Sequence, residues 1–241
     1  TPKPSSAASD VYKRQVLETC VEDPACVSND NFPFMGVIET VLKDKIPCRI
    51  ARISFSGELA YEVYTPSDYG PAAMDLLWGV SEPIGGCLYG LEALGAMRIE
   101  KGHVTGAELD GRVTIEDAGL GRMASSKKSY IGSALRKRPE LVREDRPRLV
   151  GIFPINRHET FNAGAILCAA NAVQGFGDGW ISGVTHSPEL GHWIGLGFIA
   201  GGLEAWQGRS VVAADPVRKS DVAVEIVSPH MVDPDGERLY G

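Results

Sequence analysis

The carboxylate of Glu62, within the stretch 52–63, is the group in this chain whose setting best suits ligand chemistry. Apolar side chains alternate with others over residues 59–64, a β-strand pattern that places Glu62 on one face with Ala60 and Tyr64. We therefore expect Glu62 to lie in a largely apolar setting. A carboxylate there can accept paired hydrogen bonds from an amino group and a ring N–H of a flat heterocycle, while an aromatic side chain packs on the ring. The alternative is a solvated strand face, because charged residues are mostly exposed.

The elements around Glu62 are predicted to be a strand pair followed by two helices. Residues 47–55 and 59–64 form the two strands, joined at a glycine turn. Apolar residues then recur at helical spacing over 69–80, and again over 91–101, where Gly102 ends the stripe. Residues 36–43 suit either a short helix or a strand. This pattern predicts an α+β layer in which helices pack on an antiparallel sheet.

The second half of the chain has a different pattern. Residues 131–138 are predicted to be a helix, and the charged stretch 139–147 marks a domain boundary. Beyond it, six short apolar segments separated by turn residues predict a small antiparallel β-barrel: 149–153, 165–169, 179–184, 193–199, 210–213 and 221–226. We expect a truncated first domain over 16–146 and the barrel domain over 147–241. Residues 1–15 lack usable periodicity and are set aside as an adapter-derived or disordered segment.

Composition narrows the class of protein. The 241 residues are 44% hydrophobic, enough for a sizeable core, and the net charge of -7 disfavours nucleic acid as a partner. The five cysteines form no C-x-x-C pair, and the histidines lack ligand spacing, so no metal site is expected. No apolar run approaches the roughly 20 residues that span a bilayer. We expect a cytoplasmic protein with no membrane partner.

The strand pair at residues 52–63 resembles the signature of the folate-binding aminomethyltransferase family, which includes the glycine-cleavage T-protein and the folate domains of sarcosine oxidases. The sequence of residues 54–62, Ser-Phe-Ser-Gly-Glu-Leu-Ala-Tyr-Glu, is similar to the form of this motif in sarcosine oxidase α subunits. The likeness covers about residues 32–241 and continues through further motifs in family order: 89–94, 98–103, 108–114, 117–121, 187–191 and 233–238.

The resemblance implies a fold, a cofactor and partners. The fold is an aminomethyltransferase-like folate-binding domain followed by a C-terminal barrel. The cofactor is tetrahydrofolate, which would capture the one-carbon unit of sarcosine as 5,10-methylenetetrahydrofolate, with FAD or FMN and NAD bound elsewhere in a complex with other sarcosine oxidase subunits. Glu62 would anchor the pterin, Phe55 would pack beside it, and Tyr64 and Arg98 complete the candidate binding residues. Arg98 could equally be solvated or paired.

Two alternatives remain open, a T-protein and a noncatalytic folate-binding relative. The family places a catalytic Asp in an N-terminal portion that we expect to be missing here, so the catalytic residue is unknown and the isolated chain is expected to be inactive. The basic residues Lys127, Lys128 and 136–138 could meet the carboxylates of a folate tail or form a solvated face.

Overall fold

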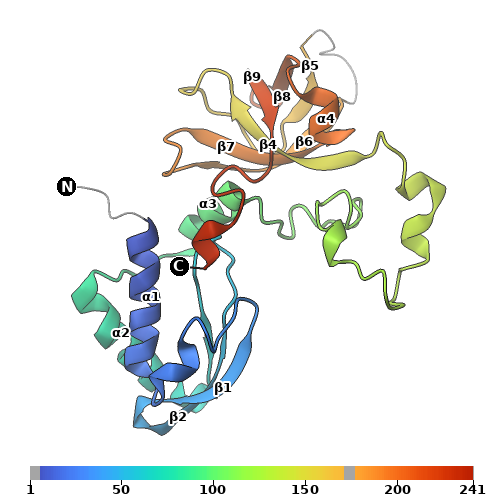
Figure 1. Cartoon of the computed structure of the whole chain (residues 1–241). Helices are drawn as coiled ribbons and strands as arrows, with labels where there is room; N and C mark the ends of the chain where they lie inside the picture. Colours follow the sequence, from blue (N-terminus) through green and yellow to red (C-terminus); the bar gives the residue numbers. More distant parts are fainter. Residues whose placement is uncertain (1–5, 171–176, 241) are drawn as a thin grey trace. The chain divides into compact units, whose positions relative to one another are not determined.

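The computed structural model describes residues 6–170 and 177–240 (Figure 1). It divides into two compact units, one made of Thr1–Leu94 with Asp235–Gly241 and the other of Gly95–Pro234. The barrel begins at Pro147, but residues 95–146 belong to the same unit as the barrel. The limits of the compact units therefore differ from the domain limits drawn from the sequence.

A three-stranded antiparallel sheet forms the centre of the first unit. Its strands are β1 (Val37–Leu42), β2 (Ile46–Ala51) and β3 (Glu62–Tyr64), in the order β1-β2-β3. The segment 36–43, which suited helix or strand, is thus a strand. The expected second strand is shorter than residues 59–64, because the chain between β2 and β3 forms a long loop in which Gly57 takes φ +87°. Strand β3 is an edge strand, and Ala51 of β2 lies opposite Glu62.

Helices α1 (Ser6–Cys20) and α2 (Gly70–Ser81) complete the core of this unit. Side chains of α1, α2, the sheet and the segment between α1 and β1 form one buried cluster: Leu17, Cys20, Val21, Val27, Phe32, Leu42, Ile46, Cys48, Ile50 and Ala73. The predicted helix over 69–80 is confirmed, and Gly85 at φ +87° follows it in a left-handed turn. Residues 6–15, set aside in the sequence, are part of α1, and residues 1–5 lie outside the described residues.

The second unit joins a helix and an irregular segment to a closed barrel. Helix α3 (Leu91–Lys101) has the predicted bounds and crosses the division between the units. The helix predicted over 131–138 is wrong, since only a short turn at Leu135–Lys137 forms there. Gly132 takes φ +89°, and Ile131 is fully exposed, so this segment has no apolar stripe to bury against a neighbour.

All six apolar segments predicted to be strands form strands of a closed barrel, so this prediction is confirmed. The strand order of the barrel is β4-β7-β6-β5-β8-β9, every pairing is antiparallel, and the short helix α4 (Gly202–Trp206) follows β7 (Figure 1). The strands are β4 (Pro147–Pro154), β5 (Ile166–Ala169), β6 (Gly179–His186), β7 (Trp193–Ala200), β8 (Val211–Asp215) and β9 (Ser220–Val227). Alternate apolar side chains fill the interior, as expected for a small barrel.

Candidate functional site

Glu62 and Tyr64 form a polar pair on the edge strand β3. Both side chains are exposed, whereas Val63 between them packs against the core, so the predicted alternation of strand faces is confirmed. The Tyr64 hydroxyl donates a hydrogen bond to the Glu62 carboxylate, and this bond raises the pKa of Tyr64. The phenol therefore stays a protonated donor at neutral pH.

The apolar setting expected for Glu62 is not found in this structure. The side chain of Glu62 faces solvent, because the core takes the opposite face of this edge strand through Val63. A carboxylate has about four lone-pair sites, so the bond from Tyr64 leaves acceptor capacity for a ligand. The pair can thus recognise a group that presents two N–H donors side by side.

Phe55 lies in the loop that leads into β3. Its ring is 39% exposed, and the loop turns where the Ser54 hydroxyl accepts a hydrogen bond from the Gly57 amide at 3.0 Å. An aromatic ring exposed in this way can pack against a flat ligand. Phe55, Glu62 and Tyr64 therefore belong to one unit and all present exposed surface.

The C-terminal segment and α1 fix this loop. The Leu59 amide donates to the Arg238 carbonyl at 2.8 Å, and Glu58 pairs with Lys13 at 3.1 Å and with Arg238 at 3.9 Å. The buried guanidinium of Arg52 donates to the carbonyls of residue 32 at 2.7 Å and residue 240 at 3.1 Å. A loop held at several points gives the candidate ligand face a defined shape.

Two buried polar atoms in the stretch 52–63 have no hydrogen-bond partner among the described residues. They are Nε of Arg52 and the hydroxyl of Tyr61, the residue before Glu62. Burial raises the pKa of Tyr61, and its ring stacks on Phe32 with the centroids 6.0 Å apart. Tyr61 packs on the core side of the strand, so the groups that fit a flat heterocyclic ligand such as a pterin are the exposed Glu62–Tyr64 pair and Phe55.

Arg98 lies on α3 in the second unit, where the structure gives it a structural partner. Its guanidinium donates to the Glu108 carboxylate at 3.0 Å and to the His103 carbonyl at 3.2 Å. This is the paired state that the sequence left open as an alternative, and a ligand-binding role for Arg98 stays a prediction.

The sequence analysis missed the buried network around Glu108. This carboxylate is fully buried and accepts hydrogen bonds from the Ser182 hydroxyl at 2.6 Å and the Thr105 amide at 2.8 Å. Burial by itself raises the pKa of Glu108, but those bonds and the charge of Arg98 outweigh it and lower the pKa below the ordinary 4.5. The only signal in the sequence is a Thr-x-x-Glu spacing over 105–108, which is typical of a capping turn.

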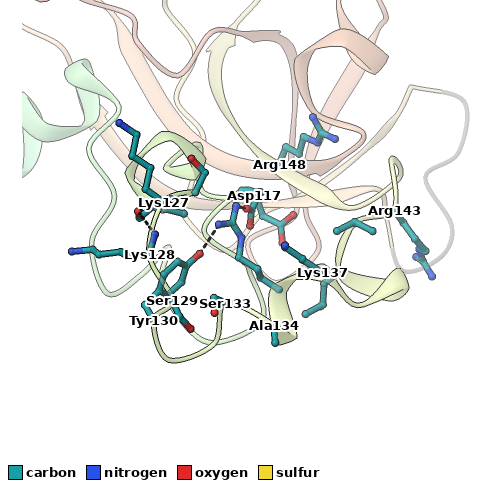
Figure 2. Close-up of a pocket in the computed structure, with 17 residues that line it drawn as sticks. Asp117, Lys127, Lys128, Ser129, Tyr130, Ser133, Ala134, Lys137, Arg143 and Arg148 are labelled. Carbon is teal, nitrogen blue, oxygen red and sulfur yellow. Dashed lines mark hydrogen bonds and ion pairs between the residues drawn. The ribbon is translucent and has the colours of Figure 1, made fainter.

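The irregular segment of the second unit lines a cavity of about 780 Å³ (Figure 2). The structure brings most of the basic run noted in the sequence to this one place, and its basic lining residues are Lys127, Lys128, Arg136, Lys137, Arg143 and Arg148. Two acidic residues, Glu116 and Asp117, also line it. Arg138, predicted with the same run, is not among the lining residues.

Comparison with known proteins gives the family. Residues 13–128 match the model of the GCVT N-terminal domain. The chain is 33% identical over 231 residues to the sarcosine oxidase subunit alpha of Rhizobium meliloti (strain 1021), covering 94% of this chain and 23% of that protein. These comparisons support an aminomethyltransferase-like family for this chain. The match agrees with the resemblance of the 52–63 strand pair.

Further relatives support the GCVT assignment. The sarcosine oxidase subunit alpha of Corynebacterium sp. (strain U-96) is 36% identical over 220 residues, covering 89% of this chain and 22% of that protein. The solved structure of aminomethyltransferase T from Bartonella henselae has the same fold, with a TM-score of 0.69 at 22% identity, covering 92% of this chain and 57% of that one. The chain thus spans less than a quarter of the length of the two sarcosine oxidase α subunits.

Two features are absent from the described residues. No helix there combines the length and apolarity needed to cross a bilayer. In the same residues, no group of three or more His, Cys, Asp and Glu side chains is arranged to hold a metal ion.

Proposed function

We propose that this chain is the tetrahydrofolate-binding part of a sarcosine-oxidase-like α subunit. The observation that carries the proposal is identity of 33–36% with two sarcosine oxidase α subunits over nearly the whole chain. The exposed Glu62–Tyr64 pair supports it, because a pterin presents an amino group and a ring N–H side by side.

In this proposal, the methyl carbon of sarcosine, oxidised at a flavin elsewhere in the enzyme, is captured by tetrahydrofolate as 5,10-methylenetetrahydrofolate, and glycine is released. The task of this chain is to bind and orient the pterin. Glu62 accepts its N–H groups, Tyr64 holds the carboxylate in place, and Phe55 packs on the ring. Fixing the folate close to the one-carbon unit supplies much of the rate, because proximity replaces a bimolecular encounter.

The partners in this proposal are the other subunits of a sarcosine oxidase in the cytoplasm, with FAD or FMN and NAD bound elsewhere in the complex. The rival is an aminomethyltransferase of the T-protein type, favoured by the match of residues 13–128 to the GCVT N-terminal domain. The two functions differ in their one-carbon donor, sarcosine in one case and an aminomethyl carrier in the other.

The test is the fate of the one-carbon unit in the full-length protein that carries this sequence. With sarcosine and limiting tetrahydrofolate, the wild type should form 5,10-methylenetetrahydrofolate. A Glu62→Gln variant should release more of the carbon as formaldehyde while it consumes sarcosine at an unchanged rate, because capture fails and oxidation continues. No consumption of sarcosine by the wild type would favour the T-protein function, and an unchanged product ratio in the variant would remove Glu62 from the folate site.

A further inference from the structure

The cavity of Figure 2 is unusual in a chain of net charge -7, because basic side chains outnumber acidic ones in its lining by six to two. The whole cavity lies within the second unit, between Glu116 and Arg148 in the sequence. Its volume of about 780 Å³ falls within the range of roughly 300–1,000 Å³ that is typical of small-molecule sites.

Ion pairs account for only part of this positive charge. Arg136 pairs with Glu116, and Arg143 bonds to Glu140 at 2.8 Å and to Asp145 at 2.9 Å. The other acidic lining residue, Asp117, pairs with Arg146, which lies outside the lining.

Four cations of the lining are left without an acidic partner within the described chain: Lys127, Lys128, Lys137 and Arg148. All four are exposed, so their charge is accessible to an anion that enters the cavity.

The four cations are spread over the cavity. Lys127 and Lys128 lie on one side, and Lys137 and Arg148 lie on the other (Figure 2). The turn that carries Lys127 and Lys128 is fixed, because the Ser125 hydroxyl accepts hydrogen bonds from both backbone amides, at 3.2 and 3.3 Å. Their flexible side chains extend outward, and a long lysine stem can fold over a bound group.

Several neutral hydroxyl groups add hydrogen-bonding capacity to the same lining. Ser126, Ser129 and Ser133 line the cavity, and hydroxyls of this kind donate readily to anionic oxygens. The Tyr130 hydroxyl accepts a hydrogen bond from Arg136 at 2.5 Å. Arg136 is thus held in place by two partners, Tyr130 and Glu116, and contributes shape rather than free charge.

We propose that this cavity binds a small multivalent anion that carries two or more carboxylate or phosphate groups. Spaced cations suit spaced anionic groups better than a single compact ion. A nucleic acid is disfavoured, because the net charge of -7 would repel a long polyanion outside the cavity. The site is distinct from the Glu62 face, which belongs to the other unit.

The test is a calorimetric titration of the 241-residue chain with two probes that contain no pterin. One is an oligo-γ-glutamate with four residues, and the other is inorganic pyrophosphate. Binding at low salt by either probe, weakening as salt is raised, is the expected result, and the tighter probe shows whether carboxylates or phosphates are the natural groups. Absence of binding by both probes would overturn the proposal.

Matched double variants separate the cavity from general surface charge. Lys128→Gln/Lys137→Gln removes two exposed lining cations and should weaken binding about tenfold, as expected for the loss of two solvent-exposed charge pairs. Arg122→Gln/Arg138→Gln removes two exposed cations outside the lining and should change the affinity less than about twofold. Equal losses in the two variants would contradict a site in the cavity. Neither probe contains a pterin, so binding by the cavity is measured apart from pterin binding at Glu62, and failure here leaves the proposed pterin site untouched.

Discussion

Glu108 shows how a single buried charge can hold the second unit together. Its carboxylate is fully buried and forms an ion pair with Arg98 of α3. It also accepts a hydrogen bond from the Ser182 hydroxyl of β6. The pair thus joins a helix to the barrel. Removing one partner of such a pair leaves the other charge without compensation in a poorly hydrated place.

We predict that Glu108→Gln lowers the free energy of unfolding by about 3 kcal/mol, because Arg98 then keeps its charge in a nearly buried site without a counterion. Urea denaturation followed by circular dichroism measures this change. The matched control is Glu140→Gln, which breaks the exposed pair with Arg143 and should cost under about 1 kcal/mol. Equal small losses in both variants would show that the buried pair contributes little.

The same carboxylate predicts a pH dependence. The pKa of Glu108 is lower in the folded chain than its ordinary 4.5, so the ionised form is favoured by folding. Its stabilisation is present above about pH 4.5 and is lost as the pH falls through the lower, folded value. The stability difference between wild type and Glu108→Gln should therefore shrink on acidification below pH 4.5. A difference that stays constant down to pH 3 would refute this assignment.

At this scale, the sequence predicted part of the candidate site. Alternation over residues 59–64 correctly put Glu62 and Tyr64 on one face, because side-chain direction in a strand depends only on local period. It could not predict that this face is exposed, since exposure depends on which elements cover a strand. Nor could it identify Glu108 as the partner of Arg98, because such pairing depends on how the chain returns after α3.

Glycines in two elements test how tightly each is packed. Gly79 lies inside α2, and a methyl group there would meet nothing within 4 Å. Gly197 lies on β7, where a methyl group would approach the Trp180 carbonyl oxygen at 2.5 Å and Cδ1 of Ile152 at 2.9 Å. Gly79 therefore has room for a methyl group, whereas at Gly197 the backbone of the neighbouring strand occupies the space.

We predict opposite effects of alanine at these two glycines. Gly79→Ala should stabilise the chain by about 0.5–1 kcal/mol, because alanine is the better helix former. Gly197→Ala should destabilise it by roughly 1–3 kcal/mol through overpacking of the barrel. Thermal unfolding of both variants is the measurement. A Gly197→Ala variant as stable as the wild type would mean that β6 and β7 are packed more loosely than described.

The elements were predicted well where a local pattern matches a buried stripe or face. Helices α2 and α3 and the six barrel strands follow from apolar spacing and turn residues. The helix predicted over 131–138 failed, because its apolar residues have no partner surface in the structure and Ile131 is exposed. Isolated short helices are marginal, so a weak pattern without tertiary packing does not suffice.

At the scale of the whole molecule, the order of packing differs from the order of the sequence. Residues 235–241 return to the first unit, where the Arg238 carbonyl accepts the Leu59 amide. No local pattern could predict this return, because it depends on contacts between residues far apart in the sequence, such as Leu59 and Arg238. The barrel itself follows from local signals, and its first strand begins at Pro147.

We predict that the 241-residue chain alone neither oxidises sarcosine nor forms 5,10-methylenetetrahydrofolate. It spans less than a quarter of its sarcosine oxidase relatives, and the resemblance assigns the flavin and the catalytic Asp to other regions. Assay of the purified chain with sarcosine, tetrahydrofolate and oxygen as the electron acceptor checks this. Measurable turnover would show that the catalytic groups are present here.

The most direct test of the proposed folate site is equilibrium titration of tetrahydrofolate into the full-length protein that carries this sequence. Glu62→Gln keeps the shape of the side chain but removes its charge, and it should weaken binding at least about tenfold, the loss of one charged hydrogen bond. Glu39→Gln, an exposed glutamate of the same sheet paired with Arg49, should leave the affinity unchanged. Equal affinity of wild type and Glu62→Gln would contradict the account and make Glu62 a solvated strand residue.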